Sequence, residues 1–220
     1  MIANGLYPDG YRFPETGDLI PSPGNLEEMR EISPRRRPSL SKERFTEADF
    51  EAFKTVLENP VGLGLTKRNE LEKLIIPSSN KEMLMSPNFF LEVKSTKGQP
   101  SVVDLQALHT GALGERGQMA LRGWRREGLG LDEKAHTITA TYIHGQLQFY
   151  SIHAGRSRIE GVELEFFMNC IDSVSINGNA ESFRTGLSMY RNLRDFAKEP
   201  RNKSISMANE MAYRTEDAEI

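Results

Sequence analysis

The stretch PNFFLEVKS, residues 87–95, is the part of the sequence from which the rest of the fold is predicted. It is an apolar run with an acid and a lysine two positions apart, so it predicts a strand whose side chains alternate between two faces. Glu92 and Lys94 would share one face. The opposite face, which would anchor the strand in a core, carries Phe89, Leu91 and Val93. The pattern places an acid and a base together on a rigid element, where a site is held most precisely.

The elements after this strand follow from periodicity. Ser101 is a plausible N-cap for a helix that contains Gln106 and extends toward Trp124, with three glycines that permit close backbone approach. The alternating runs 137–143 and 146–152, separated by His144-Gly145, predict a β-hairpin. A further strand is predicted over 162–168 and a closing helix over 180–198, where apolar residues recur at helical spacing.

The part before residue 87 predicts three helices. A short one covers 26–32 with Asn25 as its cap. An amphipathic one covers 45–57 and ends at the glycine- and proline-containing segment after Asn59. The third begins near Thr66 and ends before Pro77. We therefore expect three regions: a proline-rich arm at 1–40 without a core of its own, one domain at 41–200, and a polar tail at 201–220.

Composition excludes several classes of protein. The chain of 220 residues carries a net charge of −3, so no global field favours nucleic acid or membrane, and a phosphate-binding surface must be local. A lone cysteine, Cys170, rules out an intrachain disulfide framework, and the four histidines show no zinc-type spacing. No signal peptide and no apolar run of membrane-spanning length is visible, so the sequence predicts an intracellular protein, cytoplasmic or nuclear.

Glu92, Lys94 and Gln106 form the candidate catalytic set. A carboxylate can hold a divalent cation, an ammonium can offset charge on a phosphorane-like transition state, and Gln106 on the next helix could orient a phosphate or the attacking water. Metal-dependent phosphodiester cleavage uses such groups. The alternative is that the acid and the lysine are ordinary surface charges on the wet face of a half-buried strand.

The run Asn88 to Ser95, followed by Gln106 and by GALGERG at 111–117, resembles the PD-(D/E)XK nuclease-like superfamily, in particular a fungal group with the pattern PNFFxEVK, a glutamine helix and GALGxRG. The resemblance covers most of the chain. It implies an α/β (α+β) fold with a restriction-endonuclease-like core, in which a central mixed sheet is flanked by helices in the order αβββαβ. It also implies that Glu92 and Lys94 match the (D/E)XK pair, that Glu92 binds Mg²⁺ or Mn²⁺, and that DNA or RNA is the partner.

One part of the superfamily pattern is missing. The first metal-binding aspartate, usually in a Pro-Asp pair, is expected between the helices 45–57 and 66–76, and the linking residues 58–69 contain no aspartate. We therefore expect a shortened first catalytic segment and impaired catalysis, because divalent sites rely on such carboxylates. Glu70 is the best substitute. Pro8-Asp9 is a literal Pro-Asp pair, but its position in the arm favours a turn.

Basic residues cluster in two places. Near the end of the Gln106 helix they could form a ridge that contacts phosphates, or they could be solvated charge at a helix C-terminus; they are Arg116, Arg122, Arg125 and Arg126. Trp124 among them could stack a base or fill a core. The triplet at 35–37 is either a phosphate-contacting or nuclear-import patch or a solvated linker.

Overall fold

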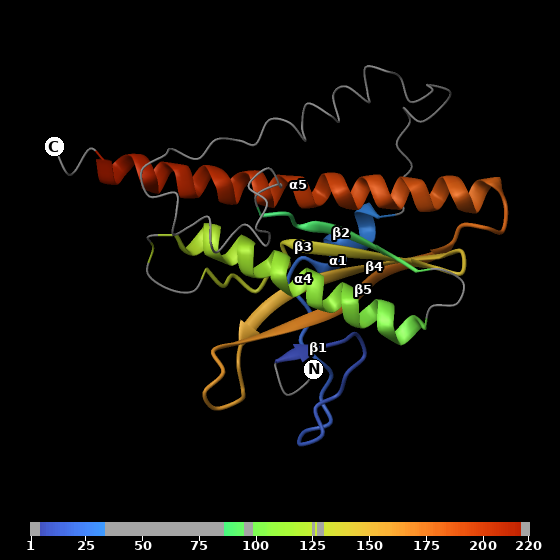
Figure 1. Cartoon of the computed structure of the whole chain (residues 1–220), viewed down its shortest axis with the longest axis horizontal. Helices are drawn as coiled ribbons and strands as arrows, with labels where there is room; N and C mark the ends of the chain where they lie inside the picture. Colours follow the sequence, from blue (N-terminus) through green and yellow to red (C-terminus); the bar gives the residue numbers. More distant parts are fainter. Residues whose placement is uncertain (1–4, 34–85, 95–98, 125, 127–129, 217–220) are drawn as a thin grey trace, which may run out of the picture.

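The computed structural model describes residues 5–33, 86–94, 99–124, 126 and 130–216, with only the backbone described for 211–216. Figure 1 shows these residues as one five-stranded sheet with helices on both faces. In chain order the elements are β1 (Leu6–Tyr7), α1 (Leu26–Ile32), β2 (Phe89–Val93), α4 (Pro100–Gly123), β3 (Thr137–Ile143), β4 (Gln146–Arg156), β5 (Leu164–Ser175) and α5 (Ala180–Glu216). The predicted helices over 45–57 and 66–76 and the arginines at 35–37 lie outside these residues.

The sheet is mixed, with the order β1-β5-β4-β3-β2. The central strands β3, β4 and β5 are antiparallel neighbours, while β2 and β1 are added in parallel at opposite edges. The predicted hairpin is confirmed: His144 and Gly145 both have positive φ, as a two-residue hairpin turn requires. The described elements depart from the αβββαβ order that the resemblance implies, because three strands rather than one follow the helix after β2. After α4 the sheet continues with three strands.

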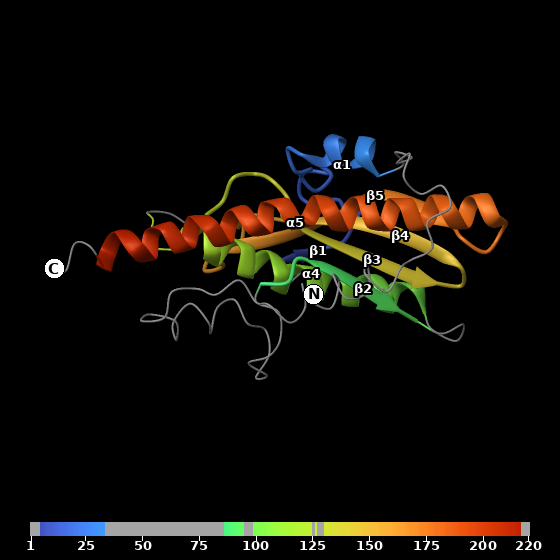
Figure 2. The same cartoon turned by 90° about the horizontal axis from the view of Figure 1, so that it is seen from above.

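The core is divided by the sheet into two apolar layers. On one face α1 and α5 cover β3, β4 and β5, with Phe149 and Leu193 fully buried between them. On the other face α4 packs through Leu108 and Ala112 against Ile152 and Met168. Figure 2 shows α5 lying along the sheet with α1 beside it. The architecture is therefore α+β, with helices on both faces of a mixed sheet.

Two glycines allow α4 to lie unusually close to the strands. A Cβ at Gly111 would collide with Ile152 and would come within 2.8 Å of Thr139 Cγ2. A Cβ at Gly114 would come within 2.6 Å of the Phe90 ring. The prediction that these glycines serve close backbone approach is confirmed. The helix begins at Pro100 with Gln99 as N-cap, two residues before the predicted cap at Ser101.

The prediction that the N-terminal arm has no core is wrong for residues 5–33. Tyr7, Phe13 and Ile20 are buried with Phe167 of β5 in an aromatic cluster of their own. The Tyr7 and Phe167 rings are stacked with their centroids 5.4 Å apart, and the centroids of Tyr7 and Phe13 are 5.2 Å apart. Prolines made this segment resemble a linker, but its aromatic residues pack together on Phe167 of β5.

The predicted end of the closing helix at Lys198 is wrong, and the stretch 205–211, which the sequence allowed as an exposed helical extension of the polar tail, is helical but partly buried. The helix α5 continues through Pro200 to Glu216. Its later half has an apolar side of its own, because Ile205 and Ala208 are buried against Leu121 of α4 beyond the end of the sheet. Among the described residues no helix is both long enough and apolar enough to cross a bilayer.

The strand β2 is an edge strand, and only part of its predicted apolar face is covered. Phe89 packs edge-on against Tyr190 of α5, with ring centroids 5.1 Å apart. Leu91 and Val93 were expected in the core, but they are 44% and 58% exposed. The reason is that α5 crosses the sheet at β3 to β5 and leaves the outer end of β2 uncovered.

Candidate functional site

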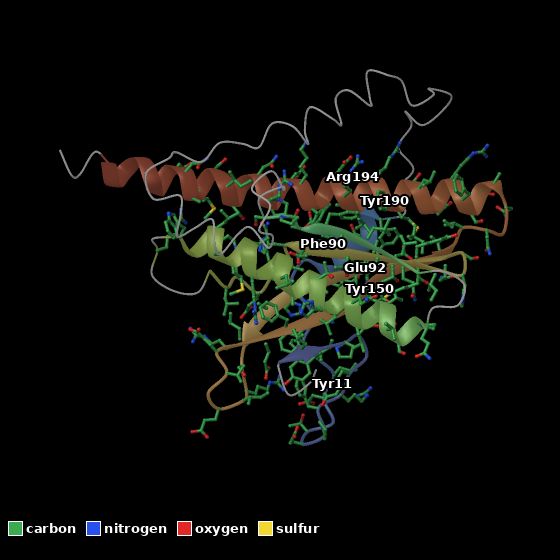
Figure 3. The ribbon with its side chains drawn as sticks, in the orientation of Figure 1. Tyr11, Phe90, Glu92, Tyr150, Tyr190 and Arg194 are labelled. Atoms are coloured by element: carbon green, nitrogen blue, oxygen red, sulfur yellow. The ribbon has the colours of Figure 1, made fainter. Side chains whose placement is uncertain are left out.

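Glu92 lies near the C-terminal end of β2, half-buried between the sheet and α4 (Figure 3). Its neighbour across the parallel ladder is Thr141 of β3. The Thr110 hydroxyl of α4 donates a hydrogen bond of 2.9 Å to Glu92 Oε1. This bond uses one acceptor site of a carboxylate that has about four, so capacity for a further ligand remains. Thr110 fixes the position of the acid relative to the helix.

Lys94 follows directly after β2, and its backbone N–H donates to the Tyr142 carbonyl at 3.0 Å, which extends the ladder by one residue. Alternation along the extended chain then places the side chains of Glu92 and Lys94 on the same side, as predicted. Both residues are half-buried.

Gln106 is exposed on α4, one helical turn before Thr110. The helix runs antiparallel to β2, since Phe90 lies against Gly114 and Glu92 against Thr110. Residues four apart on a helix lie one above the other, so Gln106 continues this row toward the level of Lys94. The structure thus brings three of the four predicted catalytic residues to one end of β2. Glu70, the fourth, lies outside the described residues.

Buried hydroxyls on β3 adjoin Glu92 and were missed by the sequence analysis. Thr139 and Thr141 are fully buried on the side of the sheet that faces α4. Among the described residues neither Oγ1 has a hydrogen-bond partner. Thr110 was missed as well. The sequence pattern that could have indicated Thr110 is its spacing of four from Gln106 on the same helix. The pattern that could have indicated the strand threonines is their alternation at 137, 139 and 141.

The described residues contain no group of three or more His, Cys, Asp and Glu side chains arranged to hold a metal ion. Asp104 of α4 accepts a hydrogen bond of 3.3 Å from the Tyr150 hydroxyl of β4, and burial raises its pKa. Magnesium sites in proteins use one or two carboxylates and take the remaining oxygens from water and substrate phosphates. Glu92 therefore fits such an ion as one of its ligands, together with a phosphate-bearing substrate.

Arg122 was predicted to contact phosphates, and this prediction is wrong because the guanidinium points inward. Arg122 is only 9% exposed and Glu115 is fully buried, and the two form an ion pair of 3.2 Å. The Arg122 Nε also donates to the Gly130 carbonyl at 3.0 Å. Arg116 and Arg126 are exposed, and Arg116 lies over the Phe166 ring at 5.2 Å. Arg125 lies outside the described residues.

The Arg122 pair belongs to a buried network at the start of β3. The second carboxylate oxygen of Glu115 accepts the His136 backbone N–H at 3.1 Å, and the His136 ring lies 2.9 Å from both oxygens of Asp132. Burial raises the pKa of Glu115 despite the neighbouring Arg122. Burial acts in the same direction on Asp132, but His136 and Arg122 outweigh it and lower the pKa of that carboxyl. The network joins α4 to the loop before β3.

Pro8-Asp9, considered as an alternative metal-binding pair, forms a turn after β1. The Tyr11 N–H donates to the Pro8 carbonyl at 3.2 Å. Asp9 Oδ1 accepts the Cys170 backbone N–H at 3.0 Å at the edge of β5. These contacts give the pair a structural use, several strands away from Glu92.

The fold and this site define a class, an α+β protein with a mixed five-stranded sheet and an acid–lysine pair on an edge strand. Comparison with known proteins gives no match, whether to a family model, to a curated protein or to a solved structure.

Proposed function

We propose that this chain is a nuclease-like protein with a restriction-endonuclease-like core, which acts on the phosphodiester bonds of DNA or RNA with a divalent metal and has impaired catalysis. The observation that carries the proposal is the joint position of Glu92, Lys94 and Gln106 at one end of β2. Thr110 holds the acid in place at 2.9 Å. The resemblance of residues 88–117 to PD-(D/E)XK proteins supports the same assignment.

Each residue has a separate task in this proposal. Glu92 would hold Mg²⁺ or Mn²⁺ together with substrate oxygens, and the metal, when bound, would lower the pKa of an attacking water. Lys94 would offset the charge that develops on the phosphoryl oxygens. Gln106 would orient a phosphate or the water at the mouth of the site. With a single carboxylate from the described residues, we expect weak metal affinity and slow turnover.

The test is cleavage of supercoiled plasmid and of single-stranded RNA with Mg²⁺ or Mn²⁺. We expect slow cleavage by the wild type that chelation abolishes, and no cleavage by Glu92→Gln or Lys94→Ala. Glu160→Gln, an exposed acid in the turn between β4 and β5, is the matched control and should cleave normally. If the wild type and both site variants behave alike, catalysis by this site is excluded.

A second candidate function is a nucleic-acid-binding module that keeps the nuclease fold without cleavage. The Thr110 bond favours it, because a carboxylate that ties β2 to α4 has a structural use without any metal. Binding would then fall with salt, and Arg116→Glu and Arg126→Glu would each weaken it. A Glu160→Arg variant should bind nucleic acid no more weakly than the wild type. Retention that is independent of salt and of both arginines would contradict this candidate.

A further inference from the structure

Half of the large apolar side chains that are exposed in the described residues lie on β2 and on the first part of α5. They are Leu91 and Val93 of β2 and Phe183 and Leu187 of α5, with exposed fractions of 44%, 58%, 46% and 46%. We refer to these four residues as the apolar strip. Single exposed apolar residues need no explanation, but a contiguous group marks an interaction surface.

The two halves of the strip lie toward the same end of the sheet because α5 runs antiparallel to β2. The Asn88 side chain donates to the Ala197 carbonyl at 2.6 Å, and Phe89 packs against Tyr190. Moving forward along β2 therefore means moving backward along α5. Phe183 and Leu187 lie seven and three residues before Tyr190, on the same side of the helix. They continue the row that Tyr190 begins, on the side of α5 that contacts Phe89 of β2.

We propose that the apolar strip is the docking surface for the chain's own residues 45–57. The first argument is sequence complementarity. These residues carry Phe45, Phe50, Phe53, Val56 and Leu57 at helical spacing, which is one apolar side of matching character.

Charge gives the second argument. Residues 45–58 hold four acids (Glu47, Asp49, Glu51 and Glu58) against one base (Lys54), a net charge of −3. Residues 181–198 of α5 hold four bases (Arg184, Arg191, Arg194 and Lys198) against two acids (Glu181 and Asp195), a net charge of +2. Opposite charges along two surfaces that also match in apolar character favour association and set its register.

Chain connectivity gives the third argument. The described chain stops at Ser33, whose carbonyl accepts a bond of 3.1 Å from Asn192 of α5. From Asn192 to Phe183 is nine residues of helix, about 14 Å at 1.5 Å per residue. The twelve steps from Ser33 to Phe45 span up to about 40 Å when extended, so residues 45–57 reach the strip easily. The chain is next described at Ser86, which binds Gln118 at the start of β2. An intramolecular partner tethered beside its surface has a high effective concentration.

The primary test is disulfide trapping in a Cys170→Ser background. We expect the Phe53→Cys/Leu187→Cys pair to cross-link within one chain at least about tenfold faster than Glu51→Cys/Leu187→Cys, because the second pair places its cysteine on the opposite side of a helix. Equal rates for the two pairs would overturn the proposal. Disulfide-linked dimers in place of the internal bond would overturn it too, since they would show a second copy on the strip.

Limited trypsin digestion provides the second test. Docking shields Lys54, so Leu187→Glu and Phe53→Glu should each raise the rate of cleavage after Lys54 by about tenfold. Leu113→Glu on the outer side of α4 is the matched control, because Leu113 is 42% exposed and lies away from the strip. Cleavage after Lys54 that is equally fast in the wild type and all three variants would overturn the proposal.

Discussion

Two pairs of an acid and a base lie between α4 and the sheet, and they differ in exposure. Glu115 and Arg122 are buried, joined at 3.2 Å and bound further to backbone groups. Glu92 and Lys94 are both half-buried at the open edge of β2, and the one side-chain bond described for the acid comes from Thr110. Both bases, Arg122 and Lys94, were assigned from the sequence to the charge of a phosphate.

The difference shows how burial decides the use of a charge. A fully buried acid and base must satisfy each other, because removing ions from water costs several kcal/mol that only close partners offset. The Glu115 pair is therefore committed to holding the loop before β3. The Glu92 pair keeps contact with solvent at an edge, where a metal ion or a phosphate can approach it.

The largest expected effect comes from breaking the buried pair. Glu115→Gln leaves the Arg122 charge buried without its partner, so we expect a loss of about 3–5 kcal/mol in unfolding free energy. Urea denaturation monitored by far-UV circular dichroism measures it. The double variant Glu115→Gln/Arg122→Met should recover a large part of the loss, because it leaves no lone charge. A small effect of the single variant would remove the distinction between the two pairs.

A second large effect concerns a buried histidine on β4. Burial lowers the pKa of His153 to about 4 from 6.5. Between these values the unfolded chain binds the proton and the folded chain does not, so stability falls as the pH falls. The loss attributable to His153 reaches about 3 kcal/mol at pH 4. The difference between the unfolding free energies at pH 7 and pH 4 should therefore be about 3 kcal/mol smaller in His153→Leu than in the wild type. Equal pH dependence would contradict the prediction.

An intermediate effect is expected at Gly111, which lies on α4 between the levels of Glu115 and Thr110. Gly111→Ala brings a methyl group into Ile152 and to 2.8 Å from Thr139 Cγ2. Overpacking costs about 1–3 kcal/mol, partly offset by the higher helix propensity of alanine. Gly117→Ala is the matched control, since its closest contact is the Ser86 hydroxyl at 3.1 Å, and it should cost clearly less. Equal thermal stability of the two variants would show that α4 can shift away from the sheet.

The smallest effect is expected at the open pair. Glu92→Gln keeps an oxygen acceptor for Thr110 at a half-buried position, so the unfolding free energy should change by less than about 1 kcal/mol. Chemical denaturation of this variant measures the change in unfolding free energy, so that a loss of cleavage can be distinguished from a loss of stability. A loss comparable with that of Glu115→Gln would mean that Glu92 is a structural acid like Glu115.

Much of the fold could be predicted because local patterns agree with it. The helix over 26–32 and the hairpin at 137–152 are found as predicted. The errors arise where long-range packing decides the outcome. The prolines of residues 5–33 suggested a linker, and no local signal shows that Tyr7 stacks on Phe167. The polar composition after Pro200 likewise concealed that Ile205 packs on Leu121.

The candidate site was predictable to a smaller extent. Period-two alternation was enough to place Glu92 and Lys94 together, but Gln106 could be assigned only to the next helix, and its level along β2 follows from the Thr110 contact. The fate of Arg122 was not predictable from its neighbours in sequence, because it depends on Glu115 two turns earlier being fully buried. Thr110 becomes important only through the register of α4 against β2, which depends on the closeness that Gly114 permits.

The parallel pairing of β1 with β5 has a consequence for synthesis of the protein. Leu6 pairs with Phe166, a separation of 160 residues along the chain (166 minus 6). A ribosome adds about 5–20 residues per second, so the first strand waits on the order of ten seconds before its partner exists. During that interval its aromatic neighbours have no cluster to join. Chaperones that recognise emerging apolar segments would therefore meet residues 5–20 early.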